Sequence, residues 1–392
     1  MTSTQVAAKP HTSQEETFQT GEVLTIVGGH FIHDTFPAFL APLLPALIEK
    51  MSMSLTLAGS LQFFVQFPAL ITPFVGYLAD RVSLRYFVIL APAVTATSMS
   101  LLGMAPNYAI LAIILFASGI SIACFHAPAP AMISRISGDQ IGKGMSLFMA
   151  GGELGRTIGP LLVAWAVSVF TLEGMYPVMF IGWLASFILY RRLRDIPART
   201  AKPQHVRAVL PTIWRVFVPM VGVLLPRAFM LIPIQVYLPT LMKFEGASLI
   251  DAAFYLTVWE LAGVGGALLG GTLSDRLGRR AVLLFSLIMG PGITLLLLQS
   301  TGGVLVGVLL LNGFVALSTN PVLMAITQEH MPDNRAVANG VFISLAFAIR
   351  PLTAVIIGYL GDTFGLEAAF FWGAIISLLA VPSVFFLPRL EE

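Results

Sequence analysis

The sequence predicts an all-α integral membrane protein whose twelve transmembrane helices form two pseudo-symmetric six-helix bundles. Three observations lead to this fold class: the composition, a duplicated motif and the distribution of basic residues. Of the 392 residues, 57% are hydrophobic and only 11% are charged, and the mean hydropathy is +0.86. Soluble domains carry about 25% charged residues, so most of this chain is expected to lie in lipid.

A short polar motif occurs twice, 195 residues apart (271 minus 76). Residues 76–85 read GYLADRVSLR, and residues 271–280 read GTLSDRLGRR. Each copy lies between two long apolar segments. A loop with an acid and several Arg cannot lie in hydrocarbon, so each copy predicts a tight turn at a membrane surface. Its repetition at half the chain length indicates two similar halves.

Twelve apolar segments are long enough to cross a bilayer, and isolated strands could not satisfy their backbone there, so all are predicted to be helices. They are expected at about 23–48, 55–78, 86–104, 108–131, 144–170, 175–193, 213–241, 250–273, 281–300, 303–327, 335–360 and 366–388. The two bundles then cover residues 23–193 and 213–388. Residues 1–22 are expected to form a disordered cytoplasmic tail, 194–212 a basic cytoplasmic linker, and 389–392 a second tail.

Basic residues predict the orientation. With twelve spans, 17 of the 22 Lys and Arg fall on the side that holds both termini, and only Lys50 and Lys243 fall on the other. The positive-inside rule places both termini and the linker in the cytoplasm. The remaining three, Arg156, Arg227 and Arg350, fall within predicted helices.

Several classes of function are not expected. The single Cys124 excludes an intrachain disulfide and a Cys-based metal site. We see no phosphate-binding loop, metal-ligand cluster or nucleophile motif. We therefore expect no enzyme activity, cofactor, bound metal or nucleic-acid partner, and a chain that works as a monomer in the lipid bilayer.

The repeated loop resembles the signature Gly-x-x-x-Asp-Arg-x-Gly-Arg-Arg of the major facilitator superfamily. The second copy matches it fully, and the first has Ser83 where Gly is usual. Within that superfamily, residues 29–47, 66–80, 123–138 and 144–165 resemble the fosmidomycin-resistance group of bacterial drug exporters. The resemblance implies the major facilitator fold, a bacterial inner-membrane location and transport by alternating access. It also implies a cytoplasmic gate made by the two loops, with these residues: Gly76, Asp80, Arg81, Arg85, Gly271, Asp275, Arg276 and Arg280.

Charges at membrane depth are candidates for proton coupling, because each costs roughly 2.5–3.5 kcal/mol to insert and usually faces a cavity or a partner. His30 and Asp34 are four residues apart and share a helix face, as do Glu153 and Arg156 at a spacing of three. The proton-coupling candidates are Asp34, Glu153, Glu260 and His30. The alternatives remain open: Asp34 could simply accept a hydrogen bond from His30, and Glu153 could form a static ion pair with Arg156.

Three Arg within helices favour an anionic cargo, because guanidinium binds carboxylate and phosphate groups bidentately. The candidates for binding cargo are Arg156, Arg227, Arg350, His33, His126, Gln66 and Asn320. Gly151, Gly155 and Gly159 form a row of small residues that predicts close helix packing, followed by a kink at Pro160.

We therefore expect a secondary active transporter that exchanges protons for a small anionic or amphiphilic compound of the drug or phosphonate type and exports it. Protons and this compound would be its partners. One alternative is a proton symporter that imports an organic or phosphorylated anion. Another is a membrane receptor or scaffold that transports nothing.

Overall fold

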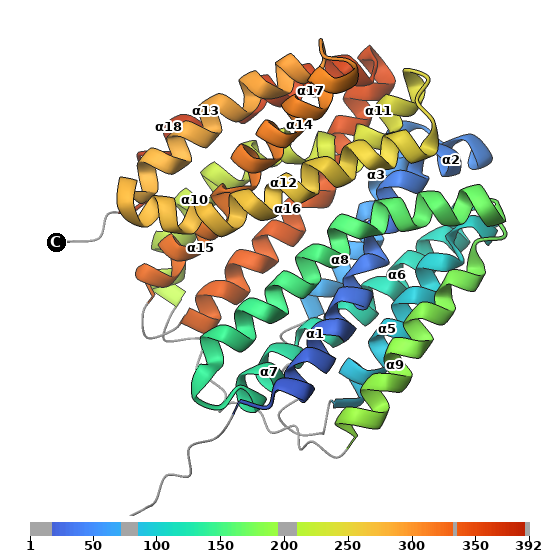
Figure 1. The fold of residues 1–392 in the computed structure, drawn as a ribbon. Coiled ribbons are helices and arrows are strands. Elements are labelled where there is room, and N and C mark those ends of the chain that lie inside the picture. The colour runs from blue at the N-terminus through green and yellow to red at the C-terminus, as the bar shows by residue number, and fades with distance from the viewer. Residues whose placement is uncertain (1–17, 72–84, 195–209, 332–334, 389–392) are drawn as a thin grey trace, which may run out of the picture.

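A computed structural model describes residues 18–71, 85–194, 210–331 and 335–388. Within these ranges the regular structure is helical (Figure 1), as the composition predicts. Ten helices or pairs of consecutive helices are long and apolar enough to span a membrane. The other two predicted spans correspond to the shorter apolar helix at Leu55–Leu70 and to the helix Met179–Leu193, whose last turn holds Arg191 and Arg192. The twelve-helix membrane fold is therefore confirmed, with ten candidate membrane spans among the described residues.

The N-terminal half contains six rods, where a rod is one long helix or a run of consecutive helical pieces. Their bounds are α1 (Thr20–Thr35), η1 (Pro37–Phe39), α2 (Leu40–Met51), α3 (Leu55–Gln66), η2 (Phe67–Ile71), α5 (Arg85–Ser100), η3 (Leu102–Met104), α6 (Tyr108–His126), α7 (Ala129–Ile136), η4 (Gly138–Gln140), α8 (Ile141–Phe170), η5 (Tyr176–Val178) and α9 (Met179–Leu193).

The C-terminal half contains the other six rods. Their bounds are α10 (Leu210–Ile232), η7 (Pro233–Tyr237), α11 (Leu238–Phe244), α12 (Leu249–Leu277), α13 (Arg279–Leu297), α14 (Gly302–Leu317), α15 (Thr319–Glu329), α16 (Arg335–Phe364), α17 (Leu366–Ser377) and α18 (Ala380–Val384). The first helix of each half begins three residues earlier than the sequence predicts. The two tails up to residue 17 and after 388, and most of the linker, lie outside the described residues.

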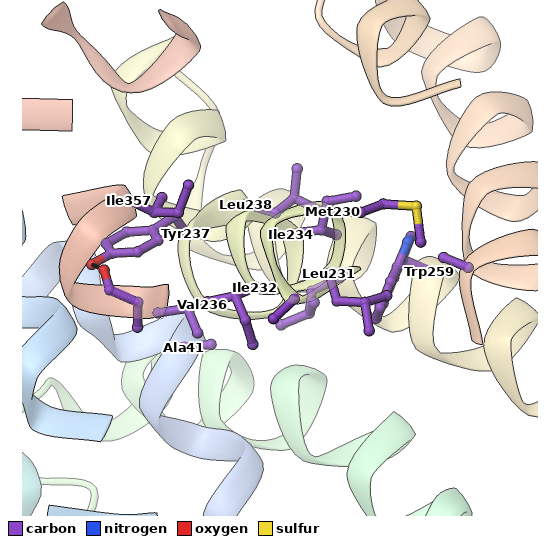
Figure 2. Close-up of a cluster of buried hydrophobic side chains, with 14 of the residues drawn as sticks. Ala41, Met230, Leu231, Ile232, Ile234, Val236, Tyr237, Leu238, Trp259 and Ile357 are labelled. Atoms are coloured by element: carbon purple, nitrogen blue, oxygen red, sulfur yellow. Dashed lines mark hydrogen bonds between the residues drawn. The ribbon is translucent and has the colours of Figure 1, made fainter. Parts of the chain in front are cut away.

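The seventh rod, α10–η7–α11, lies in the core between the halves. Its middle is a π-helical turn that starts at Pro233, where the missing N–H interrupts the regular ladder. Figure 2 shows its side chains radiating to three neighbours: Tyr237 reaches Ile357 on α16, Val236 lies beside Ala41 on α2, and Leu231 lies near Trp259 on α12. The contact of Val236 with Ala41 joins the two halves, and the other two contacts lie within the C-terminal half; all of these side chains are buried.

Hydrogen bonds also join the halves, at the end of the rods remote from the chain termini. Asp362, near the end of α16, accepts bonds from the backbone N–H groups of Leu55 (2.7 Å) and Thr56 (2.8 Å) and from the Thr56 hydroxyl (2.5 Å). A carboxylate is stabilised there because these N–H groups form the start of α3, where the helix dipole is positive. The Tyr237 hydroxyl lies 3.0 Å from the Leu55 carbonyl oxygen and 2.8 Å from that of Ala354.

Two glycines allow this close approach. A Cβ on Gly59 would lie 2.5 Å from the Ala354 carbonyl oxygen, and one on Gly358 would collide with the Leu55 carbonyl oxygen. We call the contacts of Asp362 and Tyr237 with the start of α3 the remote seal. The seal holds α3 and α16 together at one end of the molecule.

We predict that Asp362→Ala weakens the remote seal, because three donors lose a charged acceptor, at a cost of roughly 1–2 kcal/mol against the sealed arrangement. Spin labels attached at Glu49→Cys and Glu245→Cys, in a Cys124→Ser background, would report the distance between the two halves at the end that holds the seal. Pulsed electron paramagnetic resonance measures this distance. The expected result is a longer or broader distance distribution.

Asp251→Ala is the matched control, because Asp251 lies at the same end but bonds to Ser248 in its own half. If the Asp362→Ala distribution equals that of the control, Asp362 does not hold the ends together.

Candidate functional site

A row of glycines brings α8 directly onto α1. A Cβ on Gly151 would lie 2.9 Å from the Val27 carbonyl oxygen, and Cβ atoms on Gly155 and Gly159 would collide with the carbonyl oxygens of Phe31 and Thr35. The small-residue row therefore packs against the first helix. This close approach brings the polar side chains of α1 within reach of those on α8.

Gly152, beside this row, leaves room for two of those side chains. A Cβ there would lie 2.5 Å from Cε1 of His30 and 3.0 Å from Oδ2 of Asp34. His30 and Asp34 are both buried, with side chains 4% and 5% exposed, and Nε2 of His30 lies 3.3 Å from Oδ2 of Asp34. The shared helix face predicted from their spacing is present.

Arg156 links the acids of the two helices. Its Nη1 donates to Oδ2 of Asp34 at 2.7 Å, and its Nη2 pairs with Oε1 of Glu153. The Arg156 side chain is 41% exposed and that of Glu153 is 32% exposed, in contrast to Asp34. Sequence reasoning paired Arg156 with Glu153 and did not find the bond to Asp34, since nothing in the spacing says which helix the glycine row meets.

His126, at the end of α6, completes a compact cluster with α1. Its Nε2 lies 3.2 Å from Nε2 of His30 and 3.4 Å from Oδ1 of Asp34. The ligand-type atoms of these three residues lie within 4.8 Å of one another, in the arrangement of a group that could hold a metal ion. The sequence analysis expected no metal cluster, because a site assembled from two separate helices leaves no spacing motif.

The charges continue across the boundary between the halves. Helix α8 packs against α12, which carries Glu260, and Glu260 interacts electrostatically with Arg156 and with Arg350 on α16. Glu260 and Arg350 are both partly exposed. The buried Nε of Arg350 has no hydrogen-bond partner among the described residues. The Arg350 side chain as a whole is partly exposed, so its guanidinium can meet an anionic group.

The other predicted cargo residues lie deeper. Arg227 is 5% exposed, and it donates from Nε to Oγ1 of Thr319 and from Nη2 to Oδ1 of Asn320, both at 2.6 Å. His33 is fully buried and stacks on Phe125 with ring centroids 4.4 Å apart. Gln66 is buried with its Oε1 unpaired in the described structure. The structure thus brings Arg156, Arg350 and His126 to partly exposed positions, leaves Asn320 exposed, and encloses Arg227, His33 and Gln66 inside the bundles.

The described residues of the second repeated loop make their ion pairs and hydrogen bonds outside this cluster. Gly76, Asp80 and Arg81 fall outside the described residues, and Arg85 begins α5. The second loop is tied within its own half. Asp275 pairs with Arg279 at 2.6 Å, and Arg279 also pairs with Glu329 at 2.7 Å.

Arg280 donates to the Leu387 carbonyl oxygen at 2.6 Å. Gly271 and Arg276 lie at the exposed end of α12. A gating role for these residues stays a prediction.

Comparison with known proteins identifies the family. The model of the major facilitator superfamily matches residues 26–350 and 234–392. A solved bacterial homologue of the human lysosomal transporter Spinster, in an inward-facing and occupied conformation, superposes with a TM-score of 0.74 at 16% identity, over 97% of this chain and 95% of that one. At this identity the likeness concerns the fold.

Three relatives cover most of the chain. The uncharacterized MFS-type transporter YfnC of Bacillus subtilis (strain 168) is 26% identical over 93% of this chain and 92% of its own length. The fosmidomycin resistance protein of Escherichia coli (strain K12) is 25% identical over 91% of this chain and 90% of its own. The citrate-proton symporter of Klebsiella pneumoniae is 25% identical over 86% of this chain and 83% of its own.

We predict that Gly152→Ala destabilises the protein by roughly 1–3 kcal/mol, because the new methyl group forces His30 and Asp34 out of place. Gly142→Ala in the same helix is the matched control, because no atom lies within 4 Å of a Cβ there. Thermal unfolding of both purified variants measures the difference. Equal melting temperatures for the two variants would contradict the tight fit of Gly152 on α1.

Proposed function

The chain belongs to the major facilitator superfamily, and we propose that it is a proton-coupled antiporter that exports a small anionic or amphiphilic compound. Membership makes it a multi-pass membrane transporter of a small molecule, and not an enzyme. The cargo, the coupling ion and the direction are our proposal. The observation that carries it is the charge cluster formed by Arg156, Glu260 and Arg350 where the halves meet.

Alternating access is supported by the position of the remote seal. Asp362 and Tyr237 close the molecule at one end, while Arg156 and Arg350 stay partly exposed between the halves. With both termini in the cytoplasm, this arrangement is inward-facing. The outward-facing state would need the contacts of Asp362 with α3 to break, so the seal biases the equilibrium between the two states.

An anionic cargo is supported by the two guanidinium groups. Arg350 has an unpaired Nε, and Arg156 already binds two carboxylates, Asp34 and Glu153. A carboxylate or phosphonate on the cargo can satisfy the free donor of Arg350. It can also replace Glu153, the more exposed partner of Arg156.

Glu260 supplies a group that can exchange a proton against such a cargo. A compound that carries both an anion and a hydrogen-bond donor needs the ionised carboxylate of Glu260 as an acceptor, with its anion on Arg350. Protonation of Glu260 removes the charge that strengthens this hydrogen bond and so favours release of the cargo. Cargo and proton then exclude each other, which antiport requires. The likeness to the fosmidomycin resistance protein supports export.

Proton symport of an organic anion is the second candidate. If the cargo is a simple anion without a donor, the ionised Glu260 repels it and protonation promotes its binding. Proton and anion then bind together and move in the same direction. The likeness to the citrate-proton symporter favours this arrangement.

We predict that wild-type protein in proteoliposomes moves fosmidomycin or a related phosphonate against an imposed proton gradient, with pH followed by a trapped dye. Glu260→Gln should abolish the proton movement, because an amide binds no proton in this range. Arg350→Ala should weaken cargo binding by roughly 10- to 100-fold through loss of a charge-assisted contact.

Glu173→Gln is the control, since Glu173 pairs with Lys50 at the exposed surface. Co-movement of citrate and protons would identify the symporter instead. Unchanged coupling in Glu260→Gln would exclude Glu260 as the proton carrier.

A further inference from the structure

Three acceptor atoms converge at one point between α1 and α6. Nε2 of His30 lies 3.2 Å from Nε2 of His126 and 3.3 Å from Oδ2 of Asp34, and Nε2 of His126 lies 3.4 Å from Oδ1 of Asp34. We call these three residues the His–Asp–His triangle. Such close approach of three polar groups needs an attractive partner among them.

The hydrogen bonds on the other side of each ring fix its tautomer. Nδ1 of His30 lies 2.7 Å from the Phe148 carbonyl oxygen, and Nδ1 of His126 lies 3.0 Å from that of Ile122. A carbonyl oxygen only accepts, so each Nδ1 carries the hydrogen and donates it. Each neutral ring then presents the lone pair of Nε2 to the triangle. Arg156 donates to Oδ2 of Asp34, which leaves Oδ1 and the two Nε2 atoms as acceptors without a donor between them, so a cation fits where their lone pairs meet.

The charges around the triangle also favour a cation. Two carboxylates, Asp34 and Glu153, share the single guanidinium of Arg156. With both acids ionised this group carries one excess negative charge. Of these groups Asp34 is the buried one, with its side chain 5% exposed, and a buried charge is costly unless it is fully paired. A cation held by Asp34 and the two histidines removes that cost.

We propose that the His–Asp–His triangle binds a divalent transition-metal ion of the zinc class. In a tetrahedral zinc site with bonds of about 2.0–2.1 Å, neighbouring ligand atoms lie roughly 3.3–3.4 Å apart. The three separations here are similar, with the two histidines facing different oxygens of Asp34. Two imidazoles and one carboxylate suit zinc, cobalt or nickel, whereas calcium and magnesium prefer oxygen ligands throughout. The carbonyl partners of both Nδ1 atoms are the supports that metal-ligating histidines usually have.

The surroundings hold the rings in place and leave one side accessible. His30 stacks on Phe148 with centroids 3.9 Å apart and on Phe125 at 5.4 Å. The side chain of His126 is 35% exposed, whereas those of His30 and Asp34 are nearly closed off. An ion therefore enters past His126. A water molecule or a cargo atom can complete its coordination from that side.

The test is titration of the full-length chain, purified in detergent with its affinity tag removed, with Zn²⁺ in a calorimeter and with Co²⁺ in a spectrophotometer. We expect one ion per chain and the visible bands of tetrahedral Co²⁺ with nitrogen and oxygen ligands. His126→Gln and Asp34→Asn should each weaken binding by roughly 10- to 100-fold. His330→Gln, which alters a histidine in the other half, should bind as the wild type does.

A second variant guards against loss of folding. His126→Cys replaces the imidazole with another zinc ligand, so binding should persist while the Co²⁺ spectrum gains a thiolate band. Melting temperatures without metal identify any unfolded variant. Absence of binding by the folded wild type at micromolar Zn²⁺ would show that the triangle holds only a proton and would overturn the proposal. Zinc binding of equal affinity in His126→Gln and in the wild type would also overturn the proposal.

Discussion

The ion pair between Asp34 and Arg156 is the interaction on which the N-terminal half depends. Asp34 is almost completely buried, and a buried carboxylate is costly unless it is paired. Arg156 can reach it only if α8 lies directly on α1, which requires glycine wherever the two backbones touch. The same approach brings Gly152 against His30 and so fixes the ring that meets His126. One electrostatic requirement thus determines a helix contact, and the contact determines the geometry of the cluster.

The pair also connects the cluster to the boundary between the halves. Helix α8 carries Arg156 and packs on both α1 and α12, so the charge that satisfies Asp34 also interacts with Glu260. A ligand shifts a conformational equilibrium only through interactions that differ between the states. Groups that lie where α8 and α12 pack against each other, at the boundary between the halves, can supply interactions that differ between the states. Groups enclosed in one bundle, such as Arg227, keep the same partners while their bundle moves as a rigid body.

The fold was predictable because its causes are local and repeated along the chain. The length of the apolar segments predicts the helical rods, and the duplicated loop at residues 76–85 and 271–280 predicts the two halves. The spacing of His30 and Asp34 gave their shared face for the same reason. The bond of Arg156 to Asp34 and the bonds of Asp362 to Leu55 were not predictable, because they join helices far apart in the sequence. No periodicity encodes which helices meet. A histidine such as His126 shows its role only when its neighbours in space are known.

The duplication also explains why the two halves differ in chemistry while sharing a scaffold. Adding the repeat offset of 195 to Asp34 and His126 gives positions 229 and 321, within two residues of Arg227 and Asn320. Arg227 and Asn320 are hydrogen-bonded, so each half makes a polar contact between its first and fourth rods at a similar depth. In the C-terminal half a buried guanidinium donates to neutral acceptors, one of which, Asn320, is exposed. In the N-terminal half an acid meets two imidazoles, one of which is partly exposed. Donors and acceptors match in the C-terminal contact, whereas the N-terminal contact gathers acceptors and so retains ligand-binding capacity.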